Sequence, residues 1–256
     1  MSQLKTPHTG FETPSTGFET PSTGFETPST GFETPSTGLE TPIIASDLEG
    51  TLTGGETWRG IRAYLELHGR KRDYDAFMRS KLLLYFGAKI GIIPKRTFQN
   101  RWISDLPQLF TGATLEEFGR VAAWVTEHEL LPKLRRKPLA ELEAVKMSGA
   151  RVILVSGTYQ PVLEAFAGHH GFEAIGTPLQ VLDGRLTGRL ASPVNFGELK
   201  CERLKAQIGA ATLTRAYGDT MPDVPMLTSA LEAVVVIGND PHLERLAQKR
   251  GWRTLE

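Results

Sequence analysis

Cysteine is nearly absent from this chain of 256 residues, since Cys201 is the only one. A single thiol excludes an internal disulfide framework and fits a reducing compartment. The N-terminal region also lacks the charged segment and apolar run of a secretory signal. The most apolar stretch, residues 82–93, is too short to span a bilayer, which takes roughly 20 apolar residues. We therefore expect a soluble, cytoplasmic protein without a membrane partner.

An excess of either charge is missing as well. Lys and Arg together number 29, and Asp and Glu together also number 29. A chain with this balance has no basic footprint of the kind that binds nucleic acid, so we expect no nucleic-acid partner. The length allows one or two domains. Nothing in the sequence indicates an oligomeric state.

Large apolar residues are sparse in residues 1–40, which consist mainly of a repeat. The unit FETPSTG occurs four times without change over residues 11–38. One large apolar residue per unit, together with a proline and a glycine, supports neither an unbroken helix nor a buried core. We predict a disordered tail, which is either a tolerated tandem duplication or a docking or phosphorylation segment. The second reading rests on the recurring Thr-Pro pair, at Thr13, Thr20, Thr27 and Thr34.

From about residue 42, short apolar runs alternate with amphipathic segments. The runs are typical of buried parallel strands and span residues 43–45, 152–155, about 214–217 and 233–237. Helical periodicity lies between and after them, in residues 137–147, 160–170, 199–208 and 242–249. Asp240 is a plausible N-cap of the last helix. We predict an α/β fold, with a Rossmann-like parallel sheet and helices on both faces.

Residues 54–134 interrupt the alternation. Helical periodicity alone occurs there, in residues 58–67, 74–86, 97–103 and 115–128. We predict an all-helical cap inserted into a core made of residues 41–53 and 135–256. A cap inserted after the first strand would lie over the carboxyl ends of the strands, where parallel sheets bind their ligands.

Each of the first three predicted strands is followed by a short polar cluster, and a lysine precedes the third strand. The members are Asp47 to Thr51, Ser156 to Thr158, Gly218 to Asp223, and Lys200. A carboxylate can attack phosphorus and form an acyl phosphate, which splits one hard step into two. Mg²⁺ prefers oxygen ligands and supplies counter-charge, while a lysine and backbone N–H groups hold phosphate oxygens. The set therefore favours magnesium-dependent phosphoryl transfer.

These residues resemble the motifs of the haloacid dehalogenase superfamily of phosphatases and phosphotransferases. The first cluster is similar to its DxDxT motif, the second to its Ser or Thr motif, and the third to its GDxxxD motif. The resemblance covers about residues 42–256. The helical insert resembles that of the phosphoserine phosphatase subgroup, and residues 181–188 resemble the β-hairpin of those enzymes.

The resemblance implies a catalytic role for three residues. Asp47 would be the nucleophile and a magnesium ligand. Glu49 would offer its backbone carbonyl to the metal, and its carboxylate as general acid and then base. Lys200 would neutralise the phosphate and orient Asp47.

The resemblance also implies the binding residues. Ser156 and the Gly157 N–H would bind phosphate, and Asp219 and Asp223 would complete the magnesium site. In phosphoserine phosphatases a glutamate at the place of Glu56 contacts the amino group of the substrate. A cap arginine is also expected in those enzymes, and the candidates are Arg79, Arg96 and Arg101.

Glu49 departs from the motif, which has aspartate at this place. A longer side chain displaces the acid and base group, which could slow hydrolysis of the acyl phosphate and favour transfer to another acceptor. Three hypotheses follow. The first is a phosphomonoesterase for a small phosphorylated metabolite, phosphoserine being the first guess. The others are a phosphotransferase to an alcohol acceptor, and a weakly active binding module recruited through the repeats.

Overall fold

The structure is a computed structural model and describes residues 41–82, 86, 90 and 95–256, with residues 95–99 described by their backbone alone. The predicted disorder of residues 1–40 therefore lies outside the described residues, as does most of the apolar stretch 82–93. Among the described residues no helix is both long enough and apolar enough to cross a membrane.

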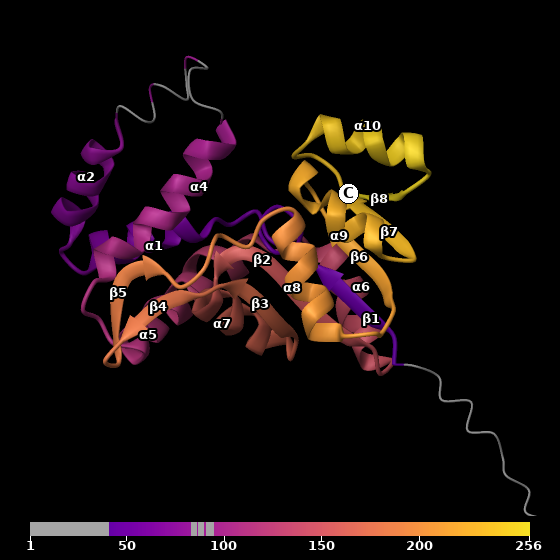
Figure 1. Cartoon of the computed structure of the whole chain (residues 1–256), viewed down its shortest axis with the longest axis horizontal. Coiled ribbons are helices and arrows are strands. Elements are labelled where there is room, and N and C mark those ends of the chain that lie inside the picture. Colours follow the sequence, from indigo (N-terminus) through magenta and orange to yellow (C-terminus); the bar gives the residue numbers. More distant parts are fainter. Residues whose placement is uncertain (1–40, 83–85, 87–89, 91–94) are drawn as a thin grey trace, which may run out of the picture. The chain divides into compact units, whose positions relative to one another are not determined.

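The centre of the fold is a six-stranded sheet in the order β3-β2-β1-β6-β7-β8, and all its strand pairs are parallel (Figure 1). The predicted parallel sheet is confirmed. Its strands are β1 (Ile43–Ser46), β2 (Arg151–Tyr159), β3 (Glu173–Thr177), β6 (Leu213–Gly218), β7 (Glu232–Val236) and β8 (Arg253–Leu255).

The two edge strands, β3 and β8, were not predicted from the sequence. They read Glu-Ala-Ile-Gly-Thr and Arg-Thr-Leu, so neither contains the continuous apolar run of a strand buried on both faces. Edge strands are short and half exposed, and their composition is that of ordinary connecting segments. Strand β2 is also longer than predicted, because it continues through residues 156–159 with an irregular register against β3.

Helices cover both faces of the sheet. Alternate residues of β1 point to opposite faces, so Ile44 belongs to one apolar cluster while Ile43 and Ala45 belong to the other. The first cluster includes side chains of α6 (Arg136–Met147) and α7 (Gln160–His170). The second includes side chains of α8 (Glu198–Ile208), α9 (Val224–Ser229) and α10 (Pro241–Arg250).

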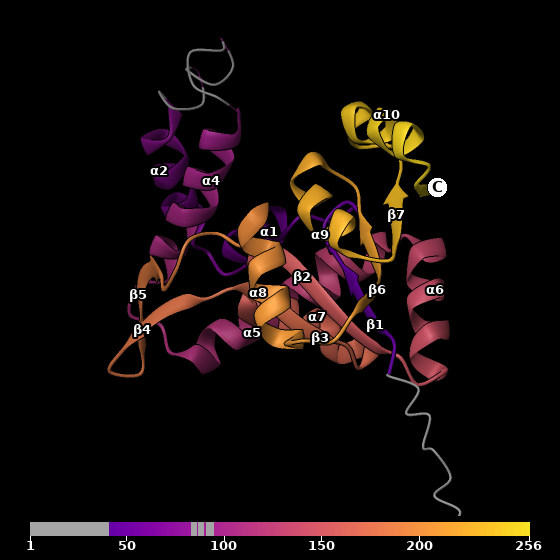
Figure 2. The ribbon, with the colours of Figure 1, turned by 45° about the vertical axis from the view of Figure 1, so that its right-hand side comes forward.

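The chain between β1 and α6 is helical wherever it forms regular structure in the described residues. It contains α1 (Thr57–Leu67), α2 (Lys71–Ser80), α4 (Lys95–Asp105) and α5 (Leu115–Val125). Helices α2 and α4 lie side by side (Figure 2). The helix expected over residues 74–86 begins earlier, and α2 ends at Ser80. The helix expected to end at residue 128 continues from α5 as a π-helical turn to Leu130.

Aromatic packing joins this helical insert to the sheet beside the strand ends. The ring of Phe118 in α5 makes edge-to-face contacts with two other rings. Its centroid lies 5.0 Å from that of Phe110 and 6.3 Å from that of Tyr159 in β2. The Tyr159 hydroxyl donates a hydrogen bond of 2.6 Å to the Ile103 carbonyl at the end of α4. The insert is therefore anchored close to the carboxyl end of β2.

The hairpin expected at residues 181–188 is present as β4 (Leu179–Leu182) and β5 (Arg185–Leu190), which pair antiparallel. Its turn consists of Asp183 and Gly184, with φ of 49° and 74°. Positive φ at both central residues is what a two-residue hairpin of the type I′ class requires, and Asp-Gly is a preferred pair there.

Candidate active site

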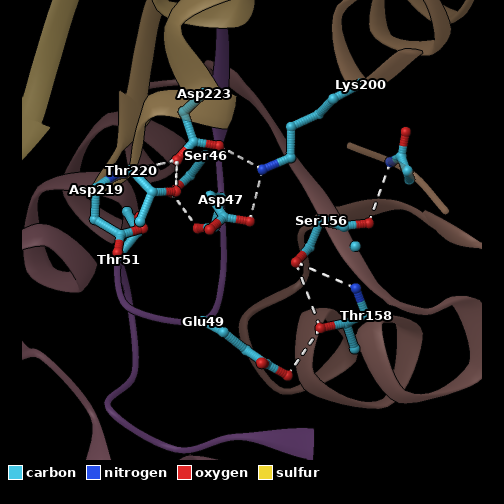
Figure 3. Close-up of polar contacts among 12 residues, drawn as sticks. Ser46, Asp47, Glu49, Thr51, Ser156, Thr158, Lys200, Asp219, Thr220 and Asp223 are labelled. Carbon is cyan, nitrogen blue, oxygen red and sulfur yellow. Dashed lines mark hydrogen bonds and ion pairs between the residues drawn. The ribbon is translucent and has the colours of Figure 1, made fainter. Parts of the chain in front are cut away.

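Side chains from three neighbouring strands meet at the carboxyl edge of the sheet (Figure 3). Asp47 follows β1, Ser156 lies near the end of β2, and Asp219 follows β6. All three are buried, although they are polar. Buried polar groups are costly unless they are paired, so their presence together marks a site.

Lys200 links two of the carboxylates. Its ammonium lies 2.8 Å from Oδ1 of Asp47 and 2.6 Å from Oδ1 of Asp223, and the residue is only 1% exposed. Burial lowers the pKa of Lys200, but the carboxylates of Asp223 and Asp47 outweigh that effect and raise the pKa above its usual value. The side chain is therefore a cation at neutral pH, held in one position by α8.

Asp223 is fixed by backbone donors. Its Oδ2 accepts hydrogen bonds from the N–H groups of Asp219 (3.2 Å) and Thr220 (3.1 Å), and also from the Thr220 hydroxyl. A Cβ on Gly218 would lie 2.5 Å from Asp223, so only glycine fits at this place. The chain turns back after Gly218, so the Asp223 carboxylate binds the backbone of its own loop through Oδ2 and the Lys200 ammonium through Oδ1.

Asp219 completes a group of three carboxylates. Oxygen atoms of Asp47, Asp219 and Asp223 all lie within 4.8 Å of one another. Burial, and then the charges of Asp47 and Asp223, raise the pKa of Asp219 to about 8. A divalent cation would relieve this crowding of negative charge, and a donor set made only of oxygens suits Mg²⁺. The residues present therefore fit the predicted ion.

The loop after β1 requires glycine at position 50. Gly50 has φ of +89°, and a Cβ there would lie 2.1 Å from Oδ2 of Asp219. Its carbonyl accepts hydrogen bonds from Arg135 and from Nδ2 of Asn239 (3.1 Å). Asn239 also donates to Oδ2 of Asp219 at 2.8 Å.

Asn239 was missed in the sequence, although a signal exists. It lies in the short polar segment after β7, the one strand end whose cluster was not considered for the site. Since β7 pairs with β6, that segment reaches the same edge of the sheet.

The peptide between Ser156 and Gly157 is also fixed in direction. Nδ2 of Asn195 donates to the Ser156 carbonyl at 3.2 Å, and the Thr177 hydroxyl donates to the Gly157 carbonyl at 2.8 Å. In a trans peptide the N–H points opposite to the carbonyl, so the Ser156 carbonyl bond also sets the direction of the Gly157 N–H. Asn195 and Thr177 occupy loop and edge-strand positions without a motif, so no pattern in the sequence predicts them.

Glu49 points away from the group of three carboxylates and toward Thr158 near the end of β2 (Figure 3). Its Oε1 accepts hydrogen bonds from the Thr57 N–H (2.9 Å), the Thr57 hydroxyl and the Thr158 hydroxyl (3.0 Å). Burial raises the pKa of the Glu49 carboxyl, and the hydrogen bonds from Thr57 and Thr158 offset only part of the rise.

A cavity of about 750 Å³ opens over these residues and is shared by core and insert. Asp47, Glu49, Ser156, Gly157 and Asp219 line its core side. The lining from the insert includes Glu56, Trp58, Asn100, Trp102 and Ile103. The site residues predicted from sequence are thus brought together here, with Lys200 and Asp223 lying behind Asp47.

Glu56, predicted to contact the substrate, lines the cavity. Its carboxylate pairs with Arg59, and its side chain is 39% exposed. Of the candidate cap arginines, Arg79 and Arg101 are exposed and do not line the cavity. The side chain of Arg96 lies outside the described residues.

The protein thus has an α/β fold with a parallel sheet. A site of three carboxylates and one lysine lies at the carboxyl ends of its strands. The family model of the haloacid dehalogenase-like hydrolases matches residues 44–228, and the chain belongs to this family. The predicted superfamily, the fold class and the assignment as an enzyme are confirmed.

Curated relatives agree with this assignment. A putative hydrolase of Mycobacterium leprae is 26% identical over 221 residues, which cover 80% of this chain and 69% of that protein. A protein named as a phosphoserine phosphatase in Mycobacterium tuberculosis is 33% identical over 110 residues. That match covers 41% of this chain and 35% of the relative, so it spans about a third of the relative's length.

Solved structures share the fold. A protein with unknown function from Bordetella pertussis has a TM-score of 0.70 at 21% identity, covering 84% of this chain and 99% of that chain. A substrate-bound phosphoserine phosphatase has a TM-score of 0.52 at 19% identity, covering 80% of this chain and 90% of that chain. At these identities the likeness concerns the fold alone.

Proposed function

We propose that this chain is a magnesium-dependent phosphomonoesterase that forms an aspartyl phosphate on Asp47. The observation that supports this most strongly is the buried Lys200, whose ammonium contacts Asp47 and Asp223 in the group of three carboxylates. Asp47 lies beside two further carboxylates, those of Asp219 and Asp223. It can approach a phosphate dianion only if the negative charges of these groups and of the phosphate are balanced. Lysine and a metal ion would provide that balance.

Asp47 would act as the nucleophile. Lys200 binds Oδ1, so Oδ2 would form the bond to phosphorus while the bond from phosphorus to the ester oxygen breaks. The ammonium keeps the carboxylate from rotating, which holds the attacking atom in line. Asp223 contributes by keeping Lys200 in place.

Asp47 and Asp219 would hold the magnesium ion, with Asp223 beside them and the Glu49 carbonyl as the ligand that the family resemblance implies. When bound, the ion would neutralise charge on the phosphate and on Asp47. The hydrogen bonds from Thr51 (2.8 Å) and Asn239 (2.8 Å) would orient the Asp219 carboxylate toward it.

Ser156 and the Gly157 N–H would bind phosphate oxygens, together with Lys200. The direction of the Gly157 N–H is set by the bond from Asn195 to the Ser156 carbonyl, so this donor needs little reorganisation when the substrate arrives. Glu49 would give its proton to the leaving alcohol in the first step. In the second step it would take a proton from the water that attacks phosphorus and releases Asp47.

The substrate would be a small phosphorylated metabolite, since the cavity of about 750 Å³ falls in the size range of small-molecule sites. Phosphoserine is our first candidate, supported by the relative named as a phosphoserine phosphatase and by Glu56 in the lining. Glu56 would contact the substrate's ammonium group.

The test is phosphate release from a panel of phosphorylated metabolites, with Mg²⁺ and with EDTA. We expect turnover that depends on Mg²⁺ and that is lost in Asp47→Asn. The substrate with the highest kcat/KM would identify the specificity. Equal turnover of Asp47→Asn and the wild type would rule out Asp47 as the nucleophile.

A second candidate is phosphotransfer to an alcohol acceptor, and the glutamate at position 49 is the observation that favours it. Transfer would yield a phosphorylated acceptor whose amount rises with acceptor concentration. If none forms at any acceptor concentration while phosphate is released, transfer is excluded.

A further inference from the structure

The carboxylate of Glu49 is held by groups from two separate parts of the fold. Thr57 is the first residue of α1 in the helical insert, whereas Thr158 belongs to β2 of the core. Together they place three hydrogen-bond donors on one oxygen, Oε1, and Figure 3 shows the bond to Thr158. Both threonine side chains are buried, at 6% and 7% exposure.

Glu49 also accepts a hydrogen bond from the first N–H group of helix α1. The first N–H groups of a helix have no partner within the helix, and a side chain at the N-cap usually supplies one. Glu56 is the N-cap of α1, but its side chain makes no capping hydrogen bond. Glu49 supplies an acceptor instead, and a carboxylate at this end of the helix interacts favourably with the helix dipole.

The reach of Glu49 is what makes the contact possible. An aspartate at position 49 would be one carbon–carbon bond shorter, about 1.5 Å. A donor and an acceptor about 3.6 Å apart no longer form a hydrogen bond, so an aspartate on this backbone would lose these bonds. The Thr57 N–H and the Thr158 hydroxyl would then be buried without an acceptor, which is unfavourable.

We propose that Thr57 and Thr158 are positioning residues that fix Glu49 for proton transfer, and that this site is built for glutamate and not for aspartate. The hydrogen bonds occupy Oε1 and leave Oε2 to carry the proton. Because Thr57 belongs to the insert and Thr158 to the core, the acid is in place only when α1 is docked on the core. This inference rests on the proposed phosphatase function.

The first test compares leaving groups in single turnovers. An alkyl phosphate needs its leaving oxygen protonated, whereas p-nitrophenol leaves without help. For Thr57→Val and Thr158→Val we expect alcohol release from the alkyl ester to fall about tenfold or more. Release of p-nitrophenol should change little. Thr57→Ser and Thr158→Ser keep the hydroxyl and should restore most of the rate.

A merely structural effect has a different signature. If the valine variants slow both substrates equally, or if the serine variants are as slow as the valine variants, Thr57 and Thr158 do not position the acid. If the wild type hydrolyses neither ester, the proposed function fails instead, and the contact itself is then tested by stability.

The stability test is a double-mutant cycle between Glu49→Gln and Thr158→Val, measured by denaturant unfolding. If the two side chains are in contact, the effects of the two substitutions on the free energy of unfolding should not be additive. Additive effects on the unfolding midpoint would overturn the inference whether or not the protein is active.

The most direct test is Glu49→Asp, which restores the residue that the family motif has. If the site is built for glutamate, this variant turns over alkyl phosphates more slowly than the wild type. If glutamate is only a displaced acid, Glu49→Asp hydrolyses them faster, and the inference is wrong.

Discussion

At the scale of single residues, the buried contacts of Lys200 link catalysis to stability. Removing one partner of a buried ion pair leaves the other charge uncompensated, which costs about 3–5 kcal/mol. We therefore expect Lys200→Met to lower the free energy of unfolding by about that amount and to abolish turnover. Urea denaturation measures the first effect. Lys205→Met, on an exposed position of the same helix, is the matched control and should change neither quantity.

Substrate recognition is a second property of single residues. Glu56→Gln removes the negative charge but keeps the shape of the side chain. We expect KM to rise for phosphate esters that carry an ammonium group and to stay the same for uncharged esters. Steady-state kinetics on phosphoserine and on a neutral alkyl phosphate measure this. Glu127→Gln, an exposed residue that does not line the cavity, is the control. An equal rise for both esters would exclude contact with the ammonium group.

The sequence was sufficient to predict the residues of the site that have a motif. Asp47 and Asp219 follow from strand ends that must meet at one edge of a parallel sheet, whereas Lys200 lies on helix α8 and was named through the resemblance to the family motifs. Asn195 and Thr177 could not be predicted, since they act by binding backbone carbonyls of the Ser156–Gly157 segment. A backbone contact leaves no pattern in the sequence.

At the scale of elements, the start of α10 shows how a cap links two parts of the site. Oδ1 of Asp240 accepts hydrogen bonds from the His242 N–H (2.9 Å) and the Leu243 N–H, and Oδ2 accepts one from the Met221 N–H (3.0 Å). Asp240→Ala should lower the free energy of unfolding by about 1 kcal/mol, and Asp240→Asn should lower it less because asparagine also caps helices.

This contribution should depend on pH in a definite direction. Burial raises the pKa of Asp240, but the three backbone donors outweigh it and lower the pKa below its usual value. A depressed pKa in the folded state means that the stabilisation is complete above the unfolded pKa and is lost as pH falls through the folded pKa. The stability difference between wild type and Asp240→Asn should shrink in that acidic range. A difference that stays constant would show that the charge of Asp240 does not contribute.

Element prediction succeeded where periodicity was strong and failed at the sheet edges. Helix α7 begins and ends at the predicted residues, because Pro161 and Gly171 mark its two ends. Strands β3 and β8 were missed because an edge strand gains its stability from one neighbour and not from an apolar sequence.

At the scale of the whole molecule, the residues of the candidate site lie in one part of the chain. Every described residue that lines the cavity falls between Asp47 and Asp240. A chain lacking residues 1–40 should therefore keep its kcat and KM. Loss of turnover in this truncated but folded chain would contradict the claim that residues 41–256 suffice for activity. Retained turnover together with loss of a bound partner would support a docking role for the repeats.

Placement of the helical insert was predictable only in part. Its position in the chain required it to lie near the strand ends, but its anchoring through Phe118 and Tyr159 depends on tertiary packing that no local pattern reveals. The same holds for the contact between Thr57 and Glu49, which joins the insert to the core.

Mass spectrometry of the enzyme quenched in acid during turnover with Mg²⁺ would show whether Asp47 becomes phosphorylated. We expect one added phosphoryl group on the peptide that contains Asp47, absent when EDTA is present and absent in Asp47→Asn. Turnover without any phosphorylated Asp47 peptide, or with the phosphoryl group on another residue, would contradict this expectation.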